Sequence, residues 1–488
     1  MMFSSNYNNN GLKVMIGRKK EIKELEELYD NGKAEFVAIY GRRRVGKTYL
    51  VDEVFKNRIT FRHAGLSPVE ISSSSKSPLK AQLEAFYYSL LLQGMKKSRC
   101  PKDWLEAFFM LEKFLQSIDD GKRMLIFLDE LPWMDSAKSG FITAFEGFWN
   151  SWGCHRENLM VIVCGSANSW IMDKLINNHG GLYGRVTHEI KLNPFTLSEC
   201  EACLNERHVN FSRYDIVQSY MIFGGIPYYL NYFNRTLSLA GNVDALFFSK
   251  NAPLRLEFDR LFTSIFKNAD KAKQIVEFLS TKGIGYTRKE IADKIGVSNS
   301  GLFGEILNSL IVSDFVVNYV PFGEGKRNER YKLVDPFCLF YLKFVKDSET
   351  LNENFWSNNI SSQNIISWRG FAFENVCFNH IDQIKKALGI AGVITRQSAF
   401  KADDTQIDLI IERRDNIVNM CEIKFYKDEF IVDKSYDSLL RNRVSILGNY
   451  LPKKYAVHNT LITTYGVKDN EYKWDFVNVV TMDDLFVE

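Results

Sequence analysis

A glycine-rich loop between a strand and a helix constrains the fold of this chain more than any other feature. Residues 41–48 read Gly-Arg-Arg-Arg-Val-Gly-Lys-Thr and match the pattern G-x-x-x-x-G-K-[ST]. The apolar run 35–40 before the loop predicts a buried strand, and residues 48–56 place their apolar side chains on one helical face. Glycines in such a loop let backbone N–H groups curl around a phosphate at the positive end of a helix.

The loop therefore predicts a nucleoside triphosphate ligand with Mg²⁺. Lys47 is expected to reach the β- and γ-phosphates, and the Thr48 hydroxyl is expected to bind the metal. The residues predicted to contact the nucleotide are Gly41, Arg42, Arg43, Arg44, Val45, Gly46, Lys47, Thr48 and Tyr49.

Two further apolar runs end in polar residues. Residues 124–130 read as a strand ending in two acids, of which Asp129 is expected to hold the magnesium and Glu130 to polarise the attacking water. Residues 160–164 read as another strand, and α/β ligands collect at the carboxyl ends of parallel strands. Ser166 is the candidate for sensing the γ-phosphate, with Asn168 as the alternative, and a helix N-cap is an equally open interpretation of Ser166.

Later turns complete a set of motifs that resembles a known family. Residues 16–22 form an early Ile-Gly-Arg box, Arg185 follows a glycine-rich turn, and residues 223–228 contain a Gly-Gly-x-Pro turn. Together with the loop and the Asp-Glu strand end, they resemble the prokaryotic AAA+ ATPases related to Orc/Cdc6 and STAND proteins, the archaeal-type ATPase family with a C-terminal DUF234 region. The resemblance implies that Arg185 acts as an arginine finger or sensor. It also implies that Gly225 and Pro227 lie against the adenine of ATP.

Composition limits the protein's class. A chain of 488 residues exceeds what one core usually supports, and 45% hydrophobic with 25% charged residues is typical of globular proteins. No apolar run is long enough to span a bilayer, and the start of the chain is polar, so we expect a cytoplasmic protein with no membrane partner. The net charge of +3 means that any nucleic-acid binding must come from a local patch.

Residues 286–333 resemble a winged helix. A short helix and a glycine turn are followed by Ser298–Ser300, which are expected to open a second helix, and then by a β-hairpin whose tip at 323–327 is basic. In a winged helix the second helix can enter the major groove of DNA while the wing contacts phosphates. Residues 298–309 carry no arginine or lysine, which argues against strong base readout. The sequence therefore does not decide whether the partner of this region is duplex DNA or a protein.

The C-terminal region holds a second candidate chemistry. An aspartate at 408 precedes a Glu-x-Lys motif at 422–424, the pattern of the PD-(D/E)XK nuclease superfamily, which the DUF234 region resembles. Asp408 and Glu422 could share Mg²⁺ or Mn²⁺, while Lys424 projects to the same face of its strand as Glu422. Lys424 would then steady the attacking water, with Glu374 as a further acid. A solvated strand edge is the alternative interpretation.

The expected fold is α/β: a P-loop AAA+ parallel-sheet ATPase core with a helical lid, a winged helix and a C-terminal α/β restriction-endonuclease-like domain. The predicted boundaries are 1–193 for the core, 194–270 for the lid, 271–346 for the winged helix, 347–365 for a linker and 366–488 for the nuclease-like domain. Two functions remain open. The first is an ATPase that acts on DNA and carries a metal-dependent nuclease. The second is a slow nucleotide-gated switch or scaffold, with a homo-oligomer, DNA or another protein as partner.

Overall fold

The computed structural model describes residues 15–488 apart from 69–70, 72–76, 178–179, 298–300, 349–351 and 403–404. The chain divides into two units, and each is described by itself. The first unit comprises Gly17–Asn193 with Arg260–Ala269, and the second comprises Pro194–Asp259 with Asp270–Glu488.

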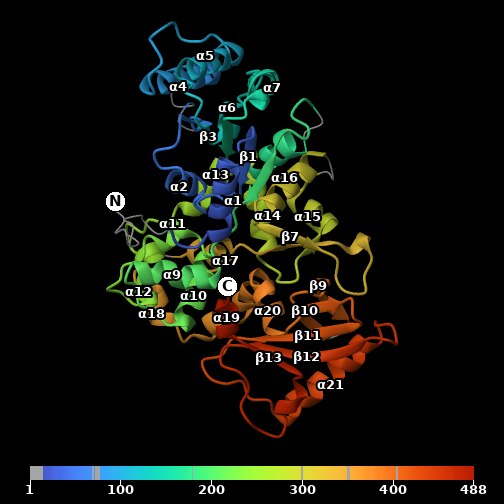
Figure 1. Ribbon diagram of the computed structural model, residues 1–488. Helices are drawn as coiled ribbons and strands as arrows, with labels where there is room; N and C mark the ends of the chain where they lie inside the picture. The colour runs from blue at the N-terminus through green and yellow to red at the C-terminus, as the bar shows by residue number, and fades with distance from the viewer. Residues whose placement is uncertain are drawn as a thin grey trace. The chain divides into compact units, whose positions relative to one another are not determined.

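A five-stranded parallel sheet forms the centre of the first unit (Figure 1). Its spatial order is β2-β3-β4-β1-β5, and all four pairings are parallel. Because helices cover both faces of such a sheet, its central strands are continuous apolar runs. The bounds are β1 (Glu35–Tyr40), β2 (Phe61–Ala64), β3 (Met124–Asp129), β4 (Leu159–Cys164) and β5 (His188–Lys191).

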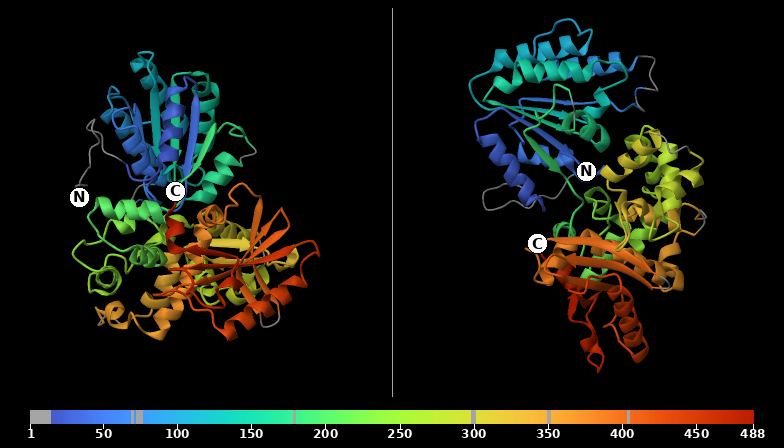
Figure 2. Two further views of the ribbon diagram at one scale, coloured as in Figure 1. Left: turned by 60° about the horizontal axis from the view of Figure 1, so that its bottom comes forward. Right: turned by 90° about the vertical axis from the view of Figure 1, so that its right-hand side faces the viewer.

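Helices α4, α5 and α7 cover one face of this sheet, and α1 and α2 cover the other (Figure 2). Phe36 and Ala38 of β1 point to the α4–α5–α7 side, where Phe86, Trp104 and Phe108 are almost completely buried. The helices are α1 (Lys19–Asp30), α2 (Lys47–Val54), α4 (Pro78–Leu92), α5 (Trp104–Ile118), α6 (Leu131–Met134), α7 (Phe141–Ser151) and α8 (Asn168–Ile171), with single turns at Gly153–His155 and Met172–Ile176.

The second unit begins with a group of short helices around the buried helix α10. Thr196 and Ser212 are the N-caps of the first two of these helices. Their side chains accept hydrogen bonds from backbone N–H groups of the first turn, which fixes where each helix begins. The elements are α9 (Leu197–Glu206), α10 (Arg213–Phe223), α11 (Pro227–Leu230), α12 (Leu239–Val243), η3 (Asp244–Phe248), α14 (Ala269–Leu279), α17 (Pro336–Phe340), η5 (Tyr341–Val345) and α18 (Phe355–Asn359). Helix α13 (Glu257–Ile265) crosses the boundary, because its residues 260–265 belong to the first unit. Helix α18 lies inside the predicted linker 347–365, of which residues 349–351 are outside the described part.

Two helices and a three-stranded antiparallel sheet follow α14. The sheet order is β6-β8-β7, and the hairpin pairs Val316 with Leu333 and Tyr319 with Arg330. The elements are β6 (Tyr286–Thr287), α15 (Arg288–Ile295), α16 (Gly301–Val312), β7 (Val316–Tyr319), η4 (Lys326–Asn328) and β8 (Arg330–Leu333). The predicted helix opening at Ser298–Ser300 lies outside the described residues.

A mixed sheet of order β13-β12-β11-β10-β9 lies between α19 and α21 in the C-terminal region (Figure 1). The register of β10 against β9 shifts between Ile407 and Ile410, which marks a β-bulge. The elements are α19 (Gln363–Asn379), α20 (Ile381–Ala387), β9 (Thr395–Ala402), β10 (Thr405–Arg413), β11 (Ile417–Lys424), α21 (Lys434–Gly448), β12 (Ala456–Thr463), η6 (Lys473–Asp475), β13 (Asn478–Thr481) and η7 (Met482–Phe486).

The structure confirms the predicted α/β class, with a parallel-sheet core and a separate C-terminal domain built on a second sheet. The finer domain boundaries stay predictions. Among the described residues, no helix is both long enough and apolar enough to cross a bilayer.

Candidate functional site

The glycine-rich loop is held in an unusual backbone conformation. Gly41 has φ 144°, Arg44 φ 73° and Gly46 φ 96°, values that L-residues with side chains rarely adopt. A Cβ atom on Gly41 would lie 2.2 Å from the carbonyl oxygen of Leu192, so no larger residue fits there. The loop then enters α2 at Lys47, which leaves the first N–H groups of that helix at its positive end.

Lys47 is buried beneath this loop. Its Nζ donates to the carbonyl oxygens of Gly41 at 3.0 Å and Arg42 at 3.2 Å. Burial lowers the pKa of Lys47, and the nearby Glu130 opposes that shift most strongly. The backbone N–H of Gly41 donates to Asn168 Oδ1 at 3.0 Å, so Asn168 anchors the start of the loop.

Thr48 and Asp129 meet although 81 residues separate them. The Thr48 hydroxyl donates to Asp129 Oδ2 at 2.9 Å. The other carboxylate oxygen, Oδ1, accepts from the thiol of Cys164, with Sγ at 2.6 Å, and from the backbone N–H of Glu130 at 2.9 Å. Burial raises the pKa of Cys164 well above its usual value, so this side chain remains a thiol that can donate. Three elements therefore fix the orientation of Asp129.

Glu130 and Ser166 form the second polar pair of the site. The Ser166 hydroxyl donates to Glu130 Oε1 at 2.6 Å, and its backbone N–H donates to Oε2 at 3.0 Å. Glu130 adopts a left-handed conformation with φ 46°, which ends β3 and starts α6. The structure thus brings Lys47, Thr48, Asp129, Glu130, Ser166 and Asn168 together at the carboxyl ends of β1, β3 and β4.

No hydrogen bond or ion pair among the described residues joins the Arg185 side chain to this cluster, and the Gly-Gly-x-Pro turn belongs to the second unit. Arg185 is exposed on its turn. Gly225 and Pro227 belong to the second unit, where Gly225 has φ 64° and accepts a hydrogen bond from the Phe195 N–H at 2.8 Å. Pro227 is the first residue of α11. The roles of all three toward a nucleotide stay predictions.

A second candidate site surrounds a cavity of about 690 Å³ in the C-terminal region. Three of the predicted residues line it, namely Glu374 on α19, Asp408 on β10 and Lys424 at the end of β11. Asp408 lies in the β-bulge of β10, and bulges redirect side chains out of the regular alternation. The lining also includes the basic residues Arg369, Lys427 and Arg443.

Glu422 contacts side chains of helix α21. This buried carboxylate accepts a hydrogen bond from the Tyr436 hydroxyl at 2.8 Å and forms an ion pair with Arg443, both from α21. Lys424 Nζ lies 3.7 Å from its Oε2. Among the described residues, no group of three or more histidine, cysteine, aspartate and glutamate side chains is arranged to hold a metal ion. The predicted sharing of a metal by Asp408 and Glu422 stays a prediction.

Lys332 of β8 is a member of this second site that the sequence did not reveal. Burial lowers the pKa of Lys332, and Glu374 and then Asp408 oppose the shift. Burial raises the pKa of Glu374 to about 8, and Asp408 adds to the shift. The predicted wing hairpin is attached to the same region, because the Phe322 N–H donates to the Ala399 carbonyl of β9 at 2.9 Å. Lys326 and Arg327 at its tip are exposed.

Sequence motifs did not point to Cys164, Arg443, Tyr436 or Lys332. Each lies outside a recognisable pattern and acts through a partner on another element. Apolar strand periodicity placed Cys164 at the end of a predicted strand but gave it no role toward Asp129, and nothing in the sequence pairs Arg443 with a residue 21 positions earlier.

Residues 15–233 match the model of an ATPase domain found predominantly in Archaea. The chain belongs to this ATPase family. A relative over most of its length is an uncharacterized protein of Methanocaldococcus jannaschii, 25% identical over 91% of this chain and 95% of the relative. An uncharacterized ATP-binding protein of the same organism is 40% identical over 48 residues, which are 10% of this chain and 81% of that protein.

Two solved structures are also similar to this ATPase. The Walker-type ATPase of Pyrococcus abyssi shares 18% identity, covering 68% of this chain and 96% of that chain with a TM-score of 0.44. The ORC2 protein of Aeropyrum pernix, in complexes with ADPNP and ADP, shares 12% identity over 73% of this chain and 98% of that chain, with a TM-score of 0.42. The family match ends at residue 233, so the resemblance of the C-terminal region to DUF234 proteins stays a prediction.

Proposed function

We propose that this ATPase binds ATP with Mg²⁺ at the loop of the first unit and uses hydrolysis to act on DNA. The hydrogen bond between Thr48 and Asp129 carries the nucleotide part of the proposal, because it joins the end of the loop to the end of β3. The groups present fit a magnesium-bound triphosphate: a loop with positive φ angles, a helix N-terminus, a buried lysine, a hydroxyl and a carboxylate.

Each of these side chains has a role that its position supports. Mg²⁺, when bound, neutralises charge on phosphate oxygens and draws electron density from the transferred phosphoryl group. Thr48 and Asp129 would hold the metal, and Lys47 would exchange the carbonyls of Gly41 and Arg42 for phosphate oxygens. Glu130 would orient the attacking water and accept its proton.

The pairing of Glu130 with Ser166 favours the alternative of a slow nucleotide-gated switch or scaffold. Both carboxylate oxygens of Glu130 accept hydrogen bonds from Ser166, so in this arrangement they are already occupied and do not face an attacking water. Turnover would then require Glu130 to move, and a partner that promotes the movement would set the rate.

An ATP turnover and binding assay on the full chain tests the nucleotide proposal. We expect Lys47→Ala to weaken ATP binding in Mg²⁺ by a factor of about 100 or more, whereas Glu130→Gln keeps its affinity and loses turnover by a factor of about 100 to 10,000. Lys56→Ala is a matched control, because Lys56 is an exposed lysine that follows α2. Unchanged ATP affinity in Lys47→Ala would contradict the proposed site.

Duplex DNA is the proposed partner of the helix and hairpin region. The exposed Lys326 and Arg327 at the hairpin tip support phosphate contacts, while α16 carries no basic residue for reading bases. Stimulation of ATP turnover by duplex DNA, with binding that weakens steeply as salt rises, would support action on DNA. Slow turnover that DNA leaves unchanged would support the switch.

Metal-dependent DNA cleavage is the second candidate function, favoured by the convergence of Glu374, Asp408 and Lys424 around one cavity. The test incubates the protein with supercoiled and linear DNA in Mg²⁺ or Mn²⁺. We expect Asp408→Ala and Lys424→Ala to abolish cleavage and Lys468→Ala, an exposed lysine of the same domain, to leave it unchanged. Cleavage that survives both substitutions rules out this site.

A further inference from the structure

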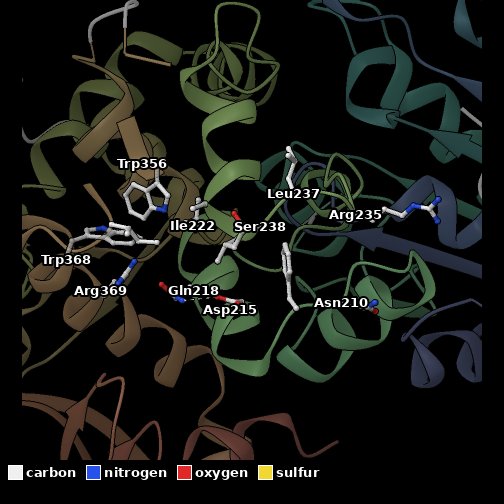
Figure 3. Close-up of a pocket in the computed structure, with 14 residues that line it drawn as sticks. Asn210, Asp215, Gln218, Ile222, Arg235, Leu237, Ser238, Trp356, Trp368 and Arg369 are labelled. Atoms are coloured by element: carbon white, nitrogen blue, oxygen red, sulfur yellow. Dashed lines mark hydrogen bonds between the residues drawn. The ribbon is translucent and has the colours of Figure 1, made fainter. Parts of the chain in front are cut away.

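A second cavity of the second unit, of about 480 Å³, lies among α10, α12, α18 and α19 (Figure 3). Trp356, Trp368 and Arg369 line one end, Asp215 and Gln218 lie beside Arg369, and Arg235 with Asn210 lies at the opposite end. A volume of this size suits a small ligand, since ligand cavities usually measure about 300–1,000 Å³.

The tryptophan end of the cavity is fixed in place by the surrounding structure. The backbone N–H of Trp356 donates to Asp244 Oδ1 at 2.7 Å, and the next N–H donates to Oδ2 at 3.0 Å. The rings of Trp356 and Trp368 meet at 5.8 Å with an interplanar angle of 88°, and both pack against Phe340 and Phe344. A ligand would therefore meet an aromatic surface that is already formed.

Arg369 supplies unused hydrogen-bond donors at this end. Its Nε and Nη2 atoms are buried and have no hydrogen-bond partner among the residues that the structure describes. Burial lowers the pKa of Arg369, and Tyr214 and then Asp215 oppose the shift. Guanidinium donors that lose water without gaining an acceptor destabilise a protein, and carboxylate or phosphate is the acceptor that matches their geometry.

The charged side chains that line the cavity with Arg369 do not accept hydrogen bonds from its Nε and Nη2 atoms. Asp215 is the carboxylate of the lining, but it accepts from the Ser212 hydroxyl at 2.9 Å and from Gln218 Nε2 at 3.4 Å. Arg235 is exposed and adds positive charge at the far end. Two arginines and one aspartate make the lining net cationic, which favours an anionic ligand over a neutral one.

We propose that this cavity binds a small organic anion whose carboxylate or phosphate pairs with the Arg369 guanidinium, while a planar body lies at the end of the cavity that Trp356 and Trp368 line. The anionic group confers selectivity and the aromatic contact adds apolar burial. Arg369 also lines the larger cavity of the C-terminal region, but the proposal requires neither ATP binding nor metal-dependent cleavage.

Calorimetric titration of the full-length Lys47→Ala variant tests the proposal, because this background removes uptake at the ATP site. One pair of probes is AMP with its neutral counterpart adenosine, and the other is indole-3-acetate with indole-3-ethanol. We expect at least one anion to bind with a Kd below about 1 mM and its neutral counterpart to bind at least about ten-fold more weakly. The two pairs distinguish a phosphate ligand from a carboxylate ligand.

Two further substitutions test whether the anion binds in this cavity. Adding Arg369→Gln should weaken anion binding at least about ten-fold, whereas adding Arg235→Gln, which removes an exposed charge at the far end, should weaken it by a smaller factor of about two to three. The comparison of charged with neutral probes needs neither variant, so it stands if Arg369→Gln fails to fold. Equal binding of charged and neutral probes, no binding of either anion at millimolar concentration, or equal losses in the two variants would each overturn the proposal.

Discussion

Ser166 holds both carboxylate oxygens of Glu130, one through its hydroxyl at 2.6 Å and the other through its backbone N–H at 3.0 Å. The two residues come from the ends of adjacent parallel strands, β4 and β3. A carboxylate that accepts a proton from water bound near a phosphate must point toward that water. In this geometry the two hydrogen bonds from Ser166 fix the orientation of the Glu130 carboxylate.

We expect Ser166→Ala to keep its ATP affinity within about three-fold and to lower turnover about ten-fold or more, because Glu130 loses its orienting hydroxyl. Ser166→Thr, which retains a hydroxyl, should recover part of the rate. Steady-state kinetics with a separate binding measurement check both. Faster turnover in Ser166→Ala would mean instead that Ser166 restrains Glu130, in agreement with the switch hypothesis.

His380 joins two helices of the second unit as a neutral ring. Its Nε2 accepts from the Leu197 N–H at 2.9 Å, and its Nδ1–H donates to the Val376 carbonyl at 2.8 Å. Burial lowers the pKa of His380 from 6.5 to about 4, and the Tyr220 ring packs edge-on at 5.0 Å. Because the folded state resists protonation, this group stabilises the protein above pH 6.5, and its contribution is lost as the pH falls toward 4.

We expect His380→Gln to be less stable than the wild type by about 1–3 kcal/mol at neutral pH. Gln does not titrate, so the stability of the wild type relative to the variant should fall by an amount on the order of 3 kcal/mol as the pH falls from about 6.5 to about 4, which cancels or reverses the difference. Denaturant unfolding followed across this pH range measures it. His208→Gln, at an exposed position of the same unit, is the control. A difference that stays constant with pH contradicts the assignment.

Sequence patterns predicted those elements whose formation depends mainly on residues that are close together in the chain. The strand, glycine loop and helix around Lys47 follow from apolar periodicity and backbone chemistry, and the structure has β1 and α2 at those residues. Parallel pairing of β1, β3 and β4 then brings Asp129 and Ser166 to one edge. Strand order alone was enough to bring these residues together.

The contacts that the sequence did not predict depend on side chains meeting across distant elements. The Glu-x-Lys pattern correctly put Glu422 and Lys424 on one strand, but the helix α21 that packs over that strand decides what Glu422 touches. The bulge that displaces Asp408 also leaves no local sequence signal. Arg369 similarly looks like an ordinary helix residue until its neighbours are known.

The pair of Glu422 and Arg443 gives a third prediction. Glu422 is 4% exposed and Arg443 19%, so removal of the arginine leaves a buried carboxylate that depends on Lys424 Nζ, 3.7 Å away, for its compensating charge. We expect Arg443→Met to lower the free energy of unfolding by about 3–5 kcal/mol, and the double variant with Glu422→Gln to recover most of the loss. Arg441→Met, on the same helix but 72% exposed, should cost about 1 kcal/mol or less. Equal losses at the two arginines would show that Glu422 does not depend on Arg443.

The exposed hairpin tip gives the last prediction. Phe322 packs against the C-terminal sheet, which holds the base of the tip, while Lys326 and Arg327 extend into solvent. If these two residues contact DNA phosphates, replacing both with Ala should weaken duplex binding uniformly across sequences and reduce the slope of log K against log salt by about 2. Fluorescence anisotropy at several salt concentrations measures this slope. Lys453→Ala with Lys454→Ala, two exposed lysines of the C-terminal domain, is the matched control, and an equal change in slope there would move the DNA surface away from the hairpin.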